Sequence, residues 1–276
     1  MNIKAINNKC QDIKNLSSNF TKLNFVNIDD KIKMMIKPAF VNNRIYHIYN
    51  RGVEERNVFL DKEDYFRFVH NLFEFNDEAP ALNLYYKLPQ LQTQSYEVQL
   101  RKVKVREREP RELLIEILLF CLMPNHFHLL IKQKADNGIV RFMQKLGTGY
   151  TNYFNKKYKR VGGLFQGRFK AVLVEKDAHF IHLPYYIHLN PLDLKFPEWR
   201  SNEIKNYEEA MKFLESYRWS SFPDYINKKN FPSVTQREFL LEFFEGPEQY
   251  KKDTLKWLKE MDLEETREEI KEIMLE

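Results

Sequence analysis

Two apolar runs joined by a short turn constrain the fold of this chain more than any other feature. LLIEILLFCLM (113–123) and FHLLIKQ (127–133) each predict a buried strand, and the Pro-Asn pair between them predicts a tight connection. Side chains two residues apart in a strand lie on the same face. We therefore expect adjacent strands that present His126 and His128 side by side.

The other predicted elements complete an α+β fold. Further strands are expected at 44–52 and 164–174, and helices at 61–75, 139–157 and 176–190, the last ended by Pro191. This order predicts a ferredoxin-like antiparallel sheet with an added helix. The strands at 44–52 and 127–133 are expected to be neighbours at its centre.

The chain divides into a predicted catalytic domain with additions. Residues 1–36 are rich in Asn and Lys and are interpreted as a tail, and residues 37–226 as the domain. Within it, residues 76–112 are interpreted as a surface excursion, although a solvated charged helix fits their charge run equally well. Residues 227–276 are expected to be a helical, acidic extension, since twelve acidic residues face six basic ones from Glu242 onward.

Composition favours a soluble cytoplasmic protein. Hydrophobic residues make up 43% of the 276 and charged residues 30%. No apolar run approaches the roughly 18 residues that a membrane-spanning helix needs. The start of the sequence lacks the apolar core of a signal peptide. Two cysteines, Cys10 and Cys121, are too few for a disulfide framework, which favours a reducing compartment.

Positive charge is concentrated in one segment. The net charge is +5, but residues 137–174 contain no acidic residue and eight basic ones, interleaved with aromatic side chains. Such a segment is suited to a polyanion, and a nucleic acid is the expected partner.

The histidine pair gains chemical meaning from the predicted helix at 176–190. Two nitrogen ligands do not specify a metal, and the pair could equally be buried and bonded to backbone. Tyr186 and Asn190, however, lie one turn apart on one helix face. The Asn190 carbonyl oxygen can bind Mg²⁺ or Mn²⁺, and Tyr186 can bring a phenolic oxygen to a phosphate held by that ion.

A phenol with a pKa of about 10 is a weak nucleophile at neutral pH, so it needs a base or a phosphorus centre activated by metal. Each residue also has a plainer interpretation: Tyr186 as a core side chain and Asn190 as a helix end. Tyr185 is a rival nucleophile about 100° away around the helix, and His182 could assist proton transfer.

Several motifs together resemble a known family. They are YHIYNRG (46–52), LMPNHFHLLI (122–131), YTNYFNKKYKRVGGLFQGRFKAV (150–172), YIHLNP (186–191) and YRWSSFPDY (217–225). In this order they resemble the single-tyrosine HUH transposases of the IS200/IS605 type, and within that family most resemble the REP-associated tyrosine transposases.

The resemblance implies an RRM-like catalytic sheet, a divalent metal and cleavage of single-stranded DNA through a 5′-phosphotyrosine. His126 and His128 match the HUH pair, Tyr186 the nucleophile and Asn190 the third metal ligand. The implied partner is single-stranded DNA, with hairpin-bearing ends, and a homodimer is possible. The expected DNA-binding side chains are Arg51, Lys156, Lys157, Lys159, Arg160, Gln166, Arg168 and Lys170.

Two other functions fit parts of the pattern. A ferredoxin-like sheet with the basic, aromatic segment could bind single strands without cutting them. A metal-dependent nuclease could use water as its nucleophile. A covalent protein–DNA adduct distinguishes the tyrosine enzyme from both.

Overall fold

The computed structural model describes residues 40–80 and 111–260. The predicted tail and residues 81–110 of the excursion lie outside these ranges. The strands are β1 (Ile45–Arg51), β2 (Ile115–Met123), β3 (His126–Gln133) and β4 (Lys170–Leu173). The α-helices are α3 (Lys62–Glu74), α5 (Gly138–Lys157), α6 (Asp177–Leu189), α7 (Tyr207–Ser216), α8 (Phe222–Tyr225), α9 (Glu238–Phe243) and α10 (Pro247–Glu260), and the 3₁₀ helices are η2 (Val53–Glu55), η4 (Asn190–Leu194) and η5 (Pro197–Ser201).

The four strands form an antiparallel sheet in the order β2-β3-β1-β4. The expected α+β class and the central β1–β3 pair are therefore confirmed. In the β1–β3 ladder Tyr49 lies opposite His128 and Arg51 opposite His126. The histidine pair thus begins an inner strand of the sheet, at the end where β1 finishes.

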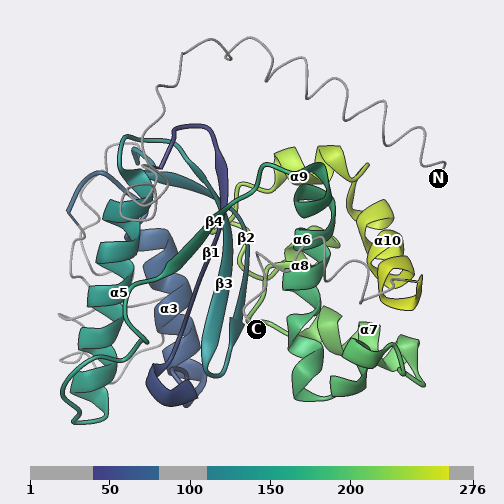
Figure 1. Cartoon of the computed structure of the whole chain (residues 1–276), viewed down its shortest axis with the longest axis horizontal. Coiled ribbons are helices and arrows are strands. Elements are labelled where there is room, and N and C mark those ends of the chain that lie inside the picture. Colours follow the sequence, from purple (N-terminus) through teal and green to yellow (C-terminus); the bar gives the residue numbers. More distant parts are fainter. Residues whose placement is uncertain (1–39, 81–110, 261–276) are drawn as a thin grey trace, which may run out of the picture. The chain divides into compact units, whose positions relative to one another are not determined.

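Helices lie on both faces of the sheet (Figure 1), and each face has its own apolar core. Phe127, Leu129 and Ile131 of β3 belong to the core shared with α3 and α5. Leu130, which shares a strand face with the two histidines, belongs to the core shared with α6 and the C-terminal helices. The period-2 pattern of β3 therefore turns both histidines toward α6.

The turn before His126 is held by the segment that follows β1. Backbone N–H groups of Gly52, Val58 and Phe59 donate to the carbonyl oxygens of the Pro-Asn turn at 2.8 to 3.1 Å. A Cβ on Gly52 would lie 2.1 Å from the Arg56 carbonyl oxygen, so this close approach requires glycine.

The expected strand at 164–174 is mostly wrong, because only Lys170–Leu173 pairs as β4. Gly167, at φ +73°, interrupts the extended backbone, and Phe165 makes a single bridge to Gly52. The basic loop before β4 is consequently a bent connection at the end of the sheet near Arg51.

The helix α6 runs without a break through Pro184 and ends where η4 begins. Asn190 caps it: its Nδ2 donates to the Tyr186 carbonyl oxygen at 2.8 Å. Pro191 follows at the first turn of η4, where a missing backbone N–H is tolerated. Both predicted site residues of this helix are therefore fixed in its last turn.

The C-terminal helices pack against α6. Tyr250, Trp257 and Leu258 of α10 share one core with Tyr186 and Leu183. Helices α9 and α10 belong to the predicted C-terminal extension at 227–276. Residues 261–276 of this extension lie outside the described ranges.

The described residues on either side of the excursion are hydrogen-bonded to each other. The Glu78 N–H donates to the Glu112 carbonyl oxygen at 2.8 Å. Among residues 40–80 and 111–260, no helix has the length and apolar character needed to span a membrane. The cytoplasmic location stays a prediction.

Candidate active site

His126 and His128 lie together at the start of β3, with ring centroids 5.1 Å apart and planes nearly perpendicular. His128 is fully buried and His126 is half-buried. Burial lowers the pKa of His126 to about 4 and also lowers that of His128 well below its ordinary value. Both imidazoles are therefore neutral at physiological pH, which is the form that ligates metal ions.

The hydrogen bonds of the pair leave one nitrogen of His128 without a partner. His126 Nδ1 lies 2.7 Å from Asn125 Oδ1, which can only accept, so His126 donates there. His128 Nδ1 lies 2.9 Å from His47 Nε2. His128 Nε2, in contrast, is buried and has no hydrogen-bond partner among the described residues.

Asn190 links α6 to this pair. Its Nδ2 donates to the Tyr186 carbonyl oxygen, and its side chain lies beside His126, where it raises the pKa of the imidazole against the larger lowering effect of burial. The structure thus brings the two predicted histidines and Asn190 together.

Tyr186 is the tyrosine of α6 that faces the histidines. Its ring stands edge-on to that of His128, with centroids 6.1 Å apart and planes at 86°. The Tyr185 ring instead packs against the rings of Tyr250 and Phe244, with a centroid separation of 5.2 Å in each case. His182 Nδ1 accepts a hydrogen bond from Trp257 Nε1 at 3.0 Å, on the α10 side.

Two charged residues at this site were missed from the sequence. The Arg200 guanidinium lies 5.9 Å from the centroid of the Tyr186 ring. Asp193 accepts from Arg200 Nε at 2.8 Å and from its terminal nitrogen at 2.7 Å. Asp193 favours the charged form of His126, and Arg200 opposes it. Asp193 and Arg200 follow α6 in the sequence, at positions that no spacing pattern connects to the histidines.

The residues present fit a divalent cation. Within residues 40–80 and 111–260, no three His, Cys, Asp or Glu side chains converge as a metal site. The candidate donors here are instead two imidazole nitrogens and one amide oxygen. The unpartnered Nε2 of His128 supports this, because a buried polar atom without a hydrogen bond is unfavourable unless a ligand satisfies it.

Some of the predicted DNA-binding residues lie at the same end of the sheet. Arg51 pairs across the ladder with His126, and its Nε donates to Gln166 Oε1 at 2.6 Å. Lys170 is exposed, with its ammonium 5.8 Å from the centroid of the Tyr49 ring. The Arg51–Gln166 pair and Lys170 are thus positioned around the start of β3.

The predicted bases at the end of α5 divide into two groups. Lys156 and Lys159 are exposed, and the Arg160 guanidinium lies 5.6 Å from the centroid of the Phe154 ring. Lys157 is engaged by acids of the α3 N-terminus, at 2.7 Å from Asp61 and 3.0 Å from Asp64.

Partial burial lowers the pKa of Lys157, but the hydrogen bonds to these two carboxylates raise it overall. Asp64 is itself fully buried. The ammonium of Lys157 therefore joins α5 to α3.

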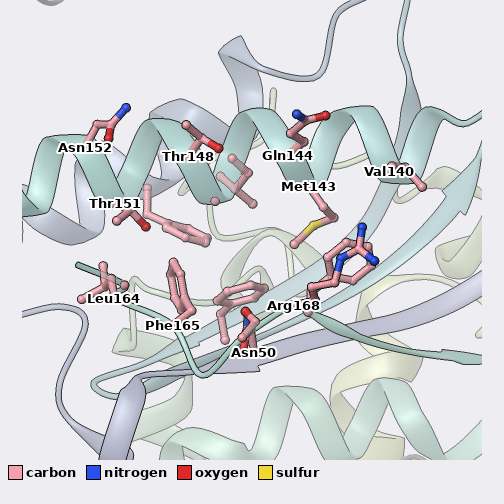
Figure 2. Close-up of a pocket in the computed structure, with 17 residues that line it drawn as sticks. Asn50, Val140, Met143, Gln144, Thr148, Thr151, Asn152, Leu164, Phe165 and Arg168 are labelled. Atoms are coloured by element: carbon pink, nitrogen blue, oxygen red, sulfur yellow. The ribbon is translucent and has the colours of Figure 1, made fainter.

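Arg168 lies at a cavity on the opposite face of the sheet from the histidines (Figure 2). This cavity of about 650 Å³ lies between α5 and the bent loop before β4. Its lining includes Asn50, Gln144, Thr148, Thr151 and Arg168, together with aromatic side chains of the core. In Figure 2, Met143 and Thr151 lie on the side of α5 that faces Phe165 and Arg168.

Comparison with known proteins finds one family similarity. Residues 90–190 match the family model described as "Transposase IS200 like". This segment contains both histidines, Tyr186 and Asn190. No curated protein matches the chain.

A solved structure described as a REP-associated tyrosine transposase bound to a REP hairpin is similar at a TM-score of 0.42 and 12% identity. The similarity covers 72% of this chain and 88% of that one.

Residues 90–190 are therefore similar to an IS200-like transposase domain, which supports a transposase. The resemblance to the single-tyrosine transposases of the IS200/IS605 type is confirmed.

Proposed function

We propose that this transposase cuts and rejoins single-stranded DNA through Tyr186, with Mg²⁺ or Mn²⁺ held by His126, His128 and Asn190. The observation that carries the proposal is the edge-on contact between the Tyr186 and His128 rings, 6.1 Å apart between centroids. It places one phenol of α6 beside neutral imidazoles whose free nitrogen has no protein partner among the described residues.

In the proposed cleavage, Tyr186 Oη attacks a backbone phosphorus. The new P–O bond to tyrosine forms as the P–O3′ bond breaks, and the departing 3′ oxygen takes up a proton while the phenol loses one. A divalent ion bound at the site would polarise the phosphate and offset its charge. The phosphotyrosine keeps the bond energy, so the reverse attack by a 3′-hydroxyl rejoins strands.

Residues around the ion have supporting roles in this proposal. The amide oxygen of Asn190 would serve as a metal ligand, while its Nδ2 keeps the last turn of α6 in place. Arg200 lies beside the Tyr186 ring and can donate to the phosphate, while its ion pair with Asp193 offsets its charge. Tyr186 is only 1% exposed, so a DNA strand reaches its hydroxyl only after side chains around α6 move.

The proposed DNA surface runs from Arg51, Gln166 and Lys170 to the exposed bases at the end of α5. Tyr150 of α5 donates to the Val58 carbonyl oxygen, and the Val58 N–H donates to the turn before His126, so the C-terminal half of α5 lies near this end of the sheet. Lys157 is left out, since it is already paired with Asp61 and Asp64. A hairpin-bearing substrate and a homodimer rest on the family resemblance alone.

The test is direct detection of the covalent intermediate. The full chain is incubated with end-labelled single strands that carry a hairpin, with Mn²⁺ or with EDTA, and the products are separated under denaturing conditions. We expect a metal-dependent protein–DNA adduct, and peptide mapping should locate the nucleotide on Tyr186. Cleavage without an adduct would indicate water as the nucleophile, and binding without cleavage would indicate a non-catalytic domain.

A further inference from the structure

His47 is a buried histidine to which the sequence pattern assigns no role. It lies in the middle of β1, is fully buried, and pairs with Leu130 of β3 on one side and Val172 of β4 on the other. Its ring is nearly parallel to that of His128, with planes 10° apart and centroids separated by 5.1 Å. Paired strands on both sides hold its backbone, so its position is well defined.

The contact between the two histidines is a hydrogen bond whose direction matters. His47 Nε2 and His128 Nδ1 are 2.9 Å apart, and between two neutral imidazoles one nitrogen donates and the other accepts. If His47 donated, the proton of His128 would sit on Nε2; if His128 donated, the proton of His47 would sit on Nδ1, an atom that is equally buried. Burial therefore does not choose between the two directions. Ligation does, because only the arrangement in which His128 donates through Nδ1 leaves a lone pair on Nε2 for a cation.

We propose that His47 is a positioning residue that accepts the Nδ1 proton of His128 and so holds the Nε2 lone pair of His128 ready for a divalent cation. The inference rests on the proposed function, in which His128 is a ligand. Metal-bound histidines commonly donate their second N–H to a neighbouring acceptor, which fixes tautomer and ring orientation. Here the acceptor is a neutral imidazole.

A neutral acceptor suits this site. The proposed ligands, two imidazoles and one amide, carry no negative charge, so the incoming phosphate is the first anion to meet the ion. A carboxylate in place of His47 would add negative charge behind His128 and weaken attraction to DNA. His47 therefore orients the ligand without altering the charge of the site.

The tautomer of His128 gives a test that requires neither metal nor DNA. Histidine labelled with ¹⁵N in the full chain reports through long-range ¹⁵N–¹H couplings which ring nitrogen carries the proton. We expect His128 in the metal-free protein to carry it on Nδ1. Finding it on Nε2 would overturn the inference without any substitution.

Two variants then separate positioning from packing. His47→Phe removes the acceptor but keeps a ring, and His47→Gln replaces it with an amide oxygen at similar reach. We expect His47→Phe to move the His128 proton to Nε2 and to raise the Kd for Mn²⁺ by roughly tenfold or more. His47→Gln should retain the Nδ1 tautomer and most of the affinity.

His188→Gln is the matched control, because His188 is also fully buried but bonds Tyr250 and Ser221 instead. It should lower thermal stability while leaving Mn²⁺ affinity unchanged. An unchanged Kd in folded His47→Phe, where His126→Ala abolishes Mn²⁺ binding, would overturn the role of His47 alone. If His126→Ala binds Mn²⁺ like the parent, the metal site and the role of His47 both fail.

Discussion

The ring of Tyr186 meets the ring of His128 edge-on, whereas the ring of its neighbour Tyr185 lies against Tyr250 on α10. Successive residues of a helix point about 100° apart, so only one of two adjacent tyrosines can face the sheet. The geometry of α6 thus favours Tyr186 over its rival Tyr185 as the proposed nucleophile.

Replacing Tyr186 with Phe should abolish the protein–DNA adduct and leave the fold nearly unchanged. The substitution removes only the phenolic oxygen and retains the buried ring. Adduct yield on labelled single strands measures the first effect, and urea unfolding measures the second. DNA affinity should stay within about threefold of the parent, since one uncharged group contributes little to a phosphate-dominated interface.

The control is Tyr185→Phe, which changes the adjacent residue in the same way. Because Tyr185 packs on the C-terminal helices, this variant should form adducts at the parental yield. Adduct formation that persists in Tyr186→Phe and disappears in Tyr185→Phe would assign the nucleophile to the other tyrosine.

Replacing His126 with Ala should remove metal-dependent stabilisation and cleavage together. A cation that binds only the folded chain raises its melting temperature by mass action, and removal of one of three ligands weakens that binding strongly. Thermal scans with and without Mn²⁺ measure the shift, which should be present in the parent and absent in the variant. Equal cleavage in EDTA and in Mn²⁺ by the parent would contradict the metal site.

Reversing Lys156 and Lys159 to Glu should weaken binding of single strands irrespective of sequence. For every phosphate that is no longer neutralised, the slope of log affinity against log salt should fall by about 0.7, so the pair should reduce it by up to about 1.4. Fluorescence anisotropy at several salt concentrations gives the slope. Lys212→Glu with Lys256→Glu, which changes net charge equally on α7 and α10, serves as the control. Equal slopes in both doubles would place the DNA elsewhere.

Lys157 should behave differently from its neighbours. Lys157→Met leaves the buried Asp64 carboxylate without its cation, so the free energy of unfolding should fall by about 2 kcal/mol. Urea denaturation measures this decrease. The salt slope of DNA binding should remain that of the parent, and a slope lowered by about 0.7 would return Lys157 to the DNA surface.

The buried His188 side chain should make the folded protein less stable in acid. Burial lowers the pKa of His188 to about 3, whereas the unfolded chain takes up this proton near pH 6.5. The unfolded state therefore binds more protons between these values, and stability falls as pH decreases through that window by about 1.4 kcal/mol per pH unit for this group. Urea unfolding from pH 7 to 4.5 should show a smaller pH slope in His188→Gln. Parallel pH profiles would contradict the assignment.

The sequence predicted those features that depend on neighbouring residues. The strand pair around the Pro-Asn turn, the shared face of His126 and His128, and the one-turn spacing of Tyr186 and Asn190 follow from local periodicity, and the structure shows each of them. The strand expected at 164–174 failed because a period-2 pattern does not reveal the positive φ of Gly167.

Features that depend on distant pairing could not be predicted. Lys157 was grouped with the DNA-binding bases, since nothing local shows that Asp61 and Asp64, more than 90 residues earlier, accept from it. His47 was noted only as part of a motif, because its contact with His128 spans 81 residues. Arg200 reaches Tyr186 through a turn that has no sequence signature.

The place of β1 in the sheet determines which residues an independently folding domain must contain. Although β1 comes first in the chain, it lies between β3 and β4, and the family match at residues 90–190 begins after it. An excised 90–190 peptide would expose two unpaired strand edges at the centre of its sheet, which is a template for aggregation. A portable module has to start before Ile45 and retain α10, whose Trp257 and Tyr250 support the helix that carries the tyrosine.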